Sequence, residues 1–309
     1  MARAIVGASR RTDIPAFYAR WWMERVRAGW VEWVHPFGGG VRRASLRPED
    51  VLAIVFWTRH PGPLIPYLHE LEGRGYRFYF HVTVNGYPRA IEPHSPPAGA
   101  AVRAFRALAD RIGPERVLWR YDPIVVGKLG GDSLDAGYHL RQFEALARQL
   151  AGATRRCTVS FVSLYAKTAR RLGQVMPGLS PGWPAQRRRE LAADLAAIAW
   201  AYGMSLQACC DDALVGAGRG EARVAKARCV DPELVAALRP GEELHLEPGP
   251  SRAQCGCARS VDVGAYDTCL FGCAYCYATR SQAAALARFR AHRPADTMLA
   301  RPAASRGAA

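Results

Sequence analysis

Short apolar runs alternate with longer helix-like segments along the first two thirds of the chain. The runs, several of them rich in β-branched or aromatic residues, cover 4–8, 51–57, 77–84, 117–125, 157–164 and 205–209. Between them, apolar residues recur at helical spacing over 16–27, 63–74, 97–112, 137–150 and 185–202. Strands that alternate with helices predict βαβ units and a parallel sheet. Because the strand runs are almost continuously apolar, we expect the sheet to be covered on both faces.

Polar residues follow several of these predicted strands. They are Ser9, Arg10, Arg11, Thr12 and Asp13, then 58–60, Asn85, 120–122 and Ser163. One such residue is unremarkable, and Asp13 before Ile14-Pro15 could be a simple cap or turn residue. In parallel α/β folds, however, ligands bind beyond the carboxyl ends of the strands. A polar group after nearly every strand therefore favours a ring of loops around one pocket.

Three cysteines near the end of the chain have the spacing C-x3-C-x2-C: Cys269, Cys273 and Cys276. They follow a strand-like run at 261–266 and precede a helical pattern at 281–291. Three thiolates can hold three irons of a [4Fe–4S] cluster, which leaves the fourth iron open to a small molecule. Zinc is the alternative, but zinc sites usually show paired C-x2-C knuckles. This loop has one such pair, so the spacing favours an iron–sulfur cluster over zinc.

A second group of cysteines lies upstream of this loop. Cys229, Cys255 and Cys257, with one of the adjacent Cys209 and Cys210, would supply four thiolates. For the fourth ligand we favour Cys210. Four thiolates suit either a second, fully ligated cluster or a structural zinc, and the long spacings leave both open. Cys157 lies inside an apolar run and is most simply a small buried hydrophobe.

The composition bounds the class of protein. With 309 residues, 50% of them hydrophobic, the chain can bury a sizeable core. It has no apolar run long enough to span a membrane and no secretory signal at its start, so nine cysteines point to a reducing cytoplasm. The net charge of +15 would attract nucleic acid. Since nearly all of that charge is arginine spread along the chain, compositional bias explains it at least as well.

Two stretches carry a resemblance to a known family. Residues 266–278, Tyr-Asp-Thr-Cys-Leu-Phe-Gly-Cys-Ala-Tyr-Cys-Tyr-Ala, resemble the signature of radical S-adenosylmethionine (SAM) enzymes, in particular the spore photoproduct lyase-like branch. Residues 83–124 resemble a stretch of the same branch that ordinarily follows the cysteine loop, whereas here they precede it. The resemblance implies a circular permutation. We therefore expect a partial or near-closed TIM-like barrel of six or seven β/α units, with the cluster-bearing strand C-terminal.

The chain as a whole is similar to the domain of unknown function 1848 family. The likeness rests on four long motifs: Ser-Arg-Arg-Thr-Asp-Ile-Pro at 9–15, Val-Phe-Trp-Thr at 55–58, Trp-Arg-Tyr-Asp-Pro at 119–123, and the cysteine motifs from 255 to 269. We expect 1–205 to hold the β/α repeats and 206–299 the cysteine-rich part with the cluster strand, loop and helix. These would form one structural domain, followed by a frayed tail over 300–309.

The radical SAM resemblance also implies roles for residues. Cys269, Cys273 and Cys276 would hold the cluster, and Tyr275 would lie against the adenine of SAM. The usual Gly-Gly-Glu segment that holds the SAM amino group is absent, and Ser9, Arg10, Thr12 and Asp13 occupy its place. Asp13 would then accept the ammonium group, and Arg120 would pair with the carboxylate.

The implied function is reductive cleavage of SAM to a 5′-deoxyadenosyl radical, which abstracts hydrogen from a substrate that the sequence does not identify. Such an enzyme needs an electron donor such as flavodoxin or ferredoxin. The alternative is a non-catalytic zinc-binding or iron–sulfur-binding module, one that contacts nucleic acid through its arginines. The sequence leaves both open.

Overall fold

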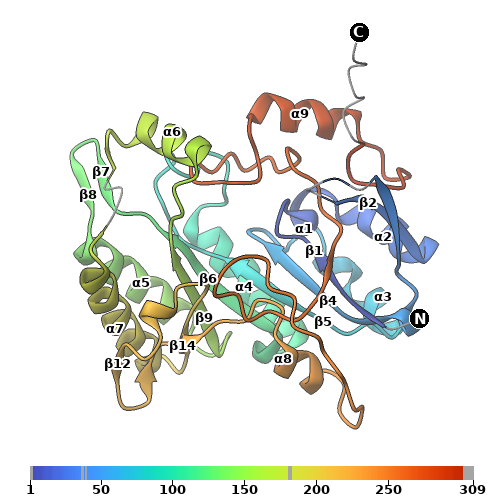
Figure 1. Ribbon diagram of the computed structural model, residues 1–309, viewed down its shortest axis with the longest axis horizontal. Helices are drawn as coiled ribbons and strands as arrows, with labels where there is room; N and C mark the ends of the chain where they lie inside the picture. Colours follow the sequence, from blue (N-terminus) through green and yellow to red (C-terminus); the bar gives the residue numbers. More distant parts are fainter. Residues whose placement is uncertain (1–2, 36–37, 39, 180–182, 302–309) are drawn as a thin grey trace.

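The computed structural model of the protein describes residues 3–35, 38, 40–179 and 183–301 (Figure 1). Its centre is an eight-stranded sheet in the order β14-β11-β9-β6-β5-β4-β1-β15. Every neighbouring pair in this sheet is parallel. The strands are β1 (Ala4–Ala8), β4 (Val51–Thr58), β5 (Phe78–Thr83), β6 (Val117–Ile124), β9 (Arg156–Phe161), β11 (Ser205–Ala208), β14 (Ala225–Lys226) and β15 (Val261–Asp262).

The six strands predicted from the first two thirds of the sequence all belong to this sheet, and the predicted helices fill the connections between them. The α-helices are α1 (Ile14–Phe17), α2 (Ala19–Ala28), α3 (Leu68–Gly73), α4 (Ala98–Ile112), α5 (Ala136–Leu150), α6 (Ala166–Val175), α7 (Ala185–Ala201), α8 (Pro232–Ala237) and α9 (Gln282–Ala291). One prediction needs correction: the single helix expected over 16–27 is two helices, because the chain leaves helical geometry at Tyr18.

Short strands outside the main sheet were not predicted. β2 (Trp30–Val34) and β3 (Val41–Ser45) form an antiparallel hairpin after α2. The other small sheets are made by β7 (Gly127–Leu129), β8 (Asp132–Leu134) and β10 (Gly178–Leu179), and by β12 (Gly218–Arg219) with β13 (Ala222–Arg223).

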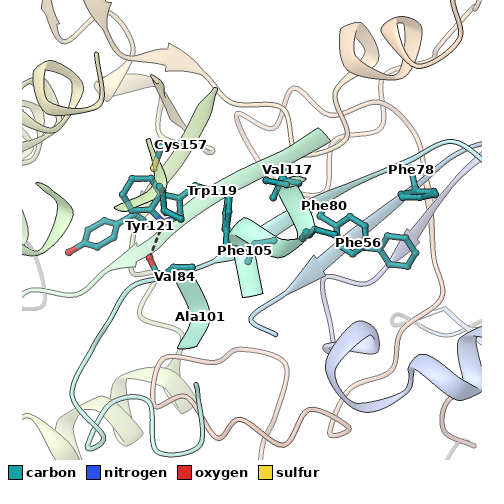
Figure 2. Close-up of a cluster of buried hydrophobic side chains, with 14 of the residues drawn as sticks. Phe56, Phe78, Phe80, Val84, Ala101, Phe105, Val117, Trp119, Tyr121 and Cys157 are labelled. Atoms are coloured by element: carbon teal, nitrogen blue, oxygen red, sulfur yellow. Dashed lines mark hydrogen bonds between the residues drawn. The ribbon is translucent and has the colours of Figure 1, made fainter. Parts of the chain in front are cut away.

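The two faces of the main sheet differ because successive side chains of a strand point to opposite sides. One face packs on α2, α3, α4, α5 and α7 and forms the larger hydrophobic core. Figure 2 shows its aromatic centre, where Phe56, Phe80 and Trp119 from β4, β5 and β6 gather with Phe105 from α4. The indole nitrogen of Trp119 donates to the carbonyl of Val84 at 2.9 Å.

The opposite face carries the alternate residues of the same strands, including Tyr79, His81, Leu118 and Arg120. It is covered by the cysteine-rich segment that follows β11: Tyr79 and Leu118 pack in one cluster with Cys209, Cys229, Cys257 and α8. The Tyr79 hydroxyl donates to the Cys229 carbonyl at 2.8 Å. Both faces are therefore covered, as the apolar strands predicted, but by different kinds of structure.

The sheet ends at β14 on one side and β15 on the other, and no ladder joins these two strands in the described part of the chain. The barrel is therefore not closed, and the TIM-like character expected from the resemblance is not confirmed. The prediction of an α/β fold with a large parallel sheet is confirmed. Its strands come from both 1–205 and 206–299, whereas 302–309 of the expected tail lie outside the described residues.

The outermost strand, β15, comes from the far end of the chain and pairs with β1, so that Val6 is opposite Val261 and Gly7 opposite Asp262. Figure 1 shows the orange C-terminal segment beside the dark blue first strand. Apart from β15, the strand order follows the chain order. None of the described helices is long and apolar enough to cross a membrane.

Candidate functional site

The cysteine loop leaves the sheet at the carboxyl end of β15 and leads into α9. Ser281 caps α9, its hydroxyl accepting from the Ala284 amide at 3.3 Å. The loop is closed at its base by the amide of Asp267, which donates to the Ala278 carbonyl at 3.0 Å. It also rests on the segment after β5, where the Ala274 amide donates to the Ile91 carbonyl at 2.9 Å. The cysteine loop is therefore fixed against loops that follow other strands.

The three thiols of this loop lie in a desolvated environment. Cys273 is buried, and Cys269 and Cys276 are half-buried. Burial raises the pKa of Cys269 well above its ordinary value, and the neighbouring Cys276, Asp13 and Cys273 raise it further. Burial also raises the pKa of Cys273 to about 11, although the Arg59 guanidinium opposes the shift. Without a metal, these two thiols are protonated at neutral pH.

A buried polar network supports the loop from behind. Arg59, which follows β4, forms an ion pair with Glu92 at 3.0 Å, and the side chains are only 12% and 4% exposed. The Tyr275 hydroxyl donates to the same Glu92 carboxylate and accepts from Arg59. The Asn85 amide nitrogen donates to Glu92 at 3.1 Å and to the Tyr275 hydroxyl at 3.2 Å. These contacts hold the Tyr275 side chain, with the Arg59 guanidinium 5.7 Å from the ring centre.

Asp13 lies beside the loop but is already engaged. One carboxylate oxygen accepts from the Ala16 amide at 2.9 Å and so caps α1, and the other accepts from the Arg59 amide at 2.6 Å. Burial raises the pKa of Asp13 to about 6, partly opposed by these hydrogen bonds and by the Thr58 side chain. Asp13 thus joins the ends of β1 and β4 next to Cys269.

The residues directly after β1 hold the cluster strand. The Ser9 hydroxyl donates to the Asp262 carboxylate at 2.7 Å, and the Arg10 amide donates to the other oxygen at 2.9 Å. The Arg11 guanidinium pairs with Asp262 at 3.3 Å and donates to its carbonyl at 2.7 Å. Within the described chain the buried hydroxyl of Thr12 has no hydrogen-bond partner.

Two residues predicted beside the cysteine loop also contact the second cysteine group. The Arg120 guanidinium donates to the Cys229 thiol at 3.1 Å and pairs with Asp122 at 2.7 Å. The Arg10 guanidinium interacts with Asp262, Cys229 and Cys257 and also with Tyr277 of the cysteine loop, whose hydroxyl donates to the Arg10 carbonyl at 2.6 Å. Arg120 therefore belongs to the second cysteine group, and Arg10 lies between that group and the cysteine loop.

That second group is brought together by the fold. The Cys209 sulfur lies 3.8 Å from that of Cys210 and 3.7 Å from that of Cys229. Cys229 is hydrogen-bonded to Cys257, and Cys257 to Cys255. The predicted ligands Cys210, Cys229, Cys255 and Cys257 are therefore neighbours, with Cys209 between Cys210 and Cys229. Among the described side chains, however, no three His, Cys, Asp or Glu groups are arranged to hold one metal ion.

Arg59, Glu92 and Asn85 support the cysteine loop, although no role was predicted for them from the sequence. Arg59 and Asn85 were visible only as polar residues after predicted strands, and Glu92 as part of the stretch that resembles the spore photoproduct lyase-like branch. A cavity of about 10 Å³ lies among them, bordered by Ser95 and the end of β5. A larger one, about 180 Å³, lies between the β2–β3 hairpin and residues 263–266.

These features define an α/β protein with a parallel sheet and two cysteine groups, one on a loop at the carboxyl end of an edge strand. The chain belongs to the domain of unknown function family DUF1848, whose sequence profile matches residues 5–278, the cysteine loop included. No curated protein matches the chain. One matching solved structure, from Bacteroides thetaiotaomicron, is described as a candidate alpha-L-fucosidase; it is 11% identical over 80% of this chain and 83% of its own, with a TM-score of 0.30. Likeness at that level says nothing about chemistry here.

Proposed function

We propose that this protein is a radical SAM enzyme in which Cys269, Cys273 and Cys276 hold a [4Fe–4S] cluster. The observation that carries this function is the position of the cysteine loop. It follows the edge strand β15, which pairs with β1, and it lies against residues that follow β1, β4 and β5. In parallel α/β folds, this edge of the sheet is where ligands bind.

The donor set fits such a cluster. Each cysteine of a three-thiolate site binds a different iron of the cube, so the thiolates need not surround a common point. The lack of a three-ligand arrangement for a single ion among the described residues is compatible with that requirement. The Arg59 guanidinium, which interacts with Cys273 and Cys269, would offset the negative charge of the ligands. Cluster binding would have to displace the thiol protons that burial retains.

The order of the strands in the sheet supports the circular permutation that the resemblance implies. In an unpermuted arrangement, the cluster loop would follow the first strand, and β1 would be the second. In this sheet β15 lies outside β1, and β4, β5, β6, β9 and β11 follow in chain order. Moving the cluster strand from the beginning of the chain to its end would leave this order unchanged.

When bound, the reduced cluster and SAM would supply homolysis to a 5′-deoxyadenosyl radical that abstracts hydrogen from the substrate. The chain's own residues would position SAM and exclude water. The buried Thr12 hydroxyl, which has no hydrogen-bond partner among the described residues, would be a candidate to contact a polar group of SAM. The Tyr275 ring, held through its hydroxyl by Glu92 and Asn85, would be the adenine contact that the resemblance implies. A one-electron donor such as flavodoxin or ferredoxin would be needed, and the substrate is not identified.

Anaerobic purification with iron and sulfide analysis tests this function. We expect a brown protein with about four irons and four sulfides per chain, which forms 5′-deoxyadenosine from SAM and a chemical reductant. Cys273→Ala should lose both the iron and the product. Cys157→Ala is the matched control, since Cys157 is buried in the helix-covered core and should not affect either.

Two results would overturn the assignment. The first is a Cys273→Ala variant that forms 5′-deoxyadenosine at the rate of the wild type. The second is a colourless wild-type protein that holds zinc but no iron. That result would favour a non-catalytic metal-binding module.

A further inference from the structure

The second cysteine group forms a chain of contacts in the order Cys210, Cys209, Cys229, Cys257, Cys255. These residues come from three separate segments: the end of β11, the loop after β14, and the C-x-C run at 255–257. Chance rarely gathers five thiols from distant parts of a chain at one place. Cys209, Cys229 and Cys257 are only 8%, 7% and 4% exposed, so the centre of the chain of thiols is shielded from solvent.

The spacing of the sulfurs distinguishes between two kinds of metal centre. Four thiolates around one zinc ion, with Zn–S bonds of about 2.3 Å in tetrahedral geometry, lie about 3.8 Å from one another. The Cys209 and Cys229 sulfurs lie 3.7 Å apart, which matches that value. The ligands of a [4Fe–4S] cube bind separate irons and must stand farther apart. The compact spacing therefore favours a single ion.

We propose that Cys209, Cys229, Cys255 and Cys257 bind one structural zinc ion. Cys209 is chosen over Cys210 because it is buried and its sulfur contacts that of Cys229, whereas Cys210 is half-exposed. Cys209 and Cys210 are adjacent in the chain, and the side chains of adjacent residues rarely bind the same ion. Cys255, which is hydrogen-bonded to Cys257, is therefore the fourth ligand of the proposed set. This proposed set differs from the one expected from the sequence, in which Cys210 stood in place of Cys209.

As they stand, the four thiols form a row, and no three of them surround a point in the part of the chain that is described. To surround one ion, the four side chains would have to rotate about a backbone that is already held in place. The Cys209 amide donates to the Val159 carbonyl at 2.9 Å, and the Ala258 amide donates to the Val230 carbonyl at 2.9 Å. The three segments are thus anchored to the sheet or to one another before any ion binds.

The groups around the thiols suit a negatively charged centre. A zinc ion with four thiolates has a net charge of −2. The Arg120 guanidinium donates to the Cys229 sulfur at 3.1 Å, and that of Arg252 donates to Cys209 at 3.8 Å. The Val230 amide donates to the Cys257 sulfur at 3.4 Å. Arg10 interacts with Cys229 and Cys257, and its buried Nη2 has no partner among the described residues. Such donors orient and stabilise metal-bound thiolates.

A zinc ion here would fasten the cysteine-rich segment across the face of the sheet that the helices leave uncovered. Cys229 connects the proposed site to the sheet, because its carbonyl accepts from the Tyr79 hydroxyl and lies 2.7 Å from a ring nitrogen of His81. Structural zinc contributes directly to folding free energy. This site is separate from the cysteine loop, so it does not depend on the proposed radical SAM function.

Zinc content measured by plasma mass spectrometry tests the site. We expect about one zinc per chain in the wild type and a loss of most of it in Cys229→Ser and Cys257→Ser. Cys210→Ser is the matched control and should keep its zinc, as should Cys157→Ala. Cys273→Ala should lose iron but keep zinc, so failure of this site and failure of the proposed cluster are distinguishable.

If the serine variants do not fold, the wild type still gives an answer. Protein produced in cobalt-supplemented medium should show the charge-transfer and ligand-field bands of tetrahedral thiolate-bound cobalt, and an octahedral spectrum would refute the site. Zinc retained in Cys229→Ser would also refute it. The site would also be refuted if the wild type held about eight irons per chain and Cys229→Ser held about four, since this would identify a second cluster. Zinc lost in Cys210→Ser but kept in Cys209→Ser would overturn the ligand set.

Discussion

The ion pair of Arg59 with Glu92 offers the sharpest test of how the cysteine loop is supported. Both side chains are almost fully buried, and the charged atoms are 3.0 Å apart. Removing one partner of a buried ion pair leaves the other charged and desolvated, which costs about 3–5 kcal/mol. We therefore expect Arg59→Met to lower the free energy of unfolding by about that amount. Glu92→Gln should also be destabilising, because it leaves the guanidinium unpaired.

The double variant, Arg59→Met with Glu92→Gln, should recover much of this loss, since no buried charge is left without a partner. A coupling energy of about 2 kcal/mol or more is expected from the double-mutant cycle. Arg228 and Glu233 supply the control: their side chains pair at 2.5 Å but are 39% and 76% exposed. Breaking an exposed pair of this kind should cost only about 0–1 kcal/mol.

The assay is urea unfolding monitored by circular dichroism, with metal content matched among the variants because bound metal shifts apparent stability. Equal urea midpoints for Arg59→Met and for Arg228→Met would show that the pair behind the loop contributes no more than a surface pair. Additive effects in the double variant would contradict the coupling, and the network could then not be said to hold Tyr275 in place.

Three further predictions concern other parts of the molecule. Burial lowers the pKa of His139 to about 4, so the unfolded chain takes up the proton first and stability falls as the pH drops from 6.5 to 4; His139→Gln should show a smaller fall in urea midpoint over that range. Burial raises the pKa of Asp13 to about 6, so ionisation of Asp13 reduces stability as the pH rises from 4 to 6. Across that window the free energy of unfolding of Asp13→Asn should rise by up to about 3 kcal/mol relative to that of the wild type. Parallel plots of unfolding free energy against pH for the two proteins would contradict this. Phe105→Ala, at a position with 0% exposure, should cost about 3–5 kcal/mol by thermal or urea unfolding, whereas Trp200→Ala, at 50% exposure, should change stability by about 0.5 kcal/mol or less.

The main sheet could be predicted because its strands are short, apolar and separated by helical patterns. The predicted run at 4–8 coincides with β1, and the remaining predicted strands overlap β4, β5, β6, β9 and β11. The β2–β3 hairpin was missed because Trp30–Val34 carries Glu32 and Val41–Ser45 carries two arginines, so neither reads as a continuous apolar run. The helix expected over 16–27 is broken at Tyr18, whose hydroxyl donates to the Thr268 carbonyl at 2.8 Å. The residues around Tyr18 in the sequence do not predict its contact with Thr268, which lies 250 positions away.

The site was less predictable, for the same reason. Spacing along the chain identified Cys269, Cys273 and Cys276, since these three residues lie on one loop. The pair of Arg59 and Glu92 and the contact between Cys209 and Cys229 depend on which loops the sheet brings together. Arg120 illustrates the limit: its place after a strand suggested a ligand-binding role beside Asp13, yet alternation along β6 turns it to the face where Cys229 lies.

Asp262 shows why the residues after β1 have to be interpreted together with the last strand. β15 has only two residues in the ladder with β1, which is a weak hold for a strand that carries the cysteine loop. Its carboxylate compensates, accepting from Ser9, from the Arg10 amide and from Arg11. The Ser-Arg-Arg run therefore joins the two ends of the chain. If the cysteine loop holds a cluster, this junction sets the position of the cluster relative to the sheet. Ser9 would then act through Asp262, and the Thr12 hydroxyl, which has no hydrogen-bond partner in the described part of the chain, would be the candidate for direct contact with SAM.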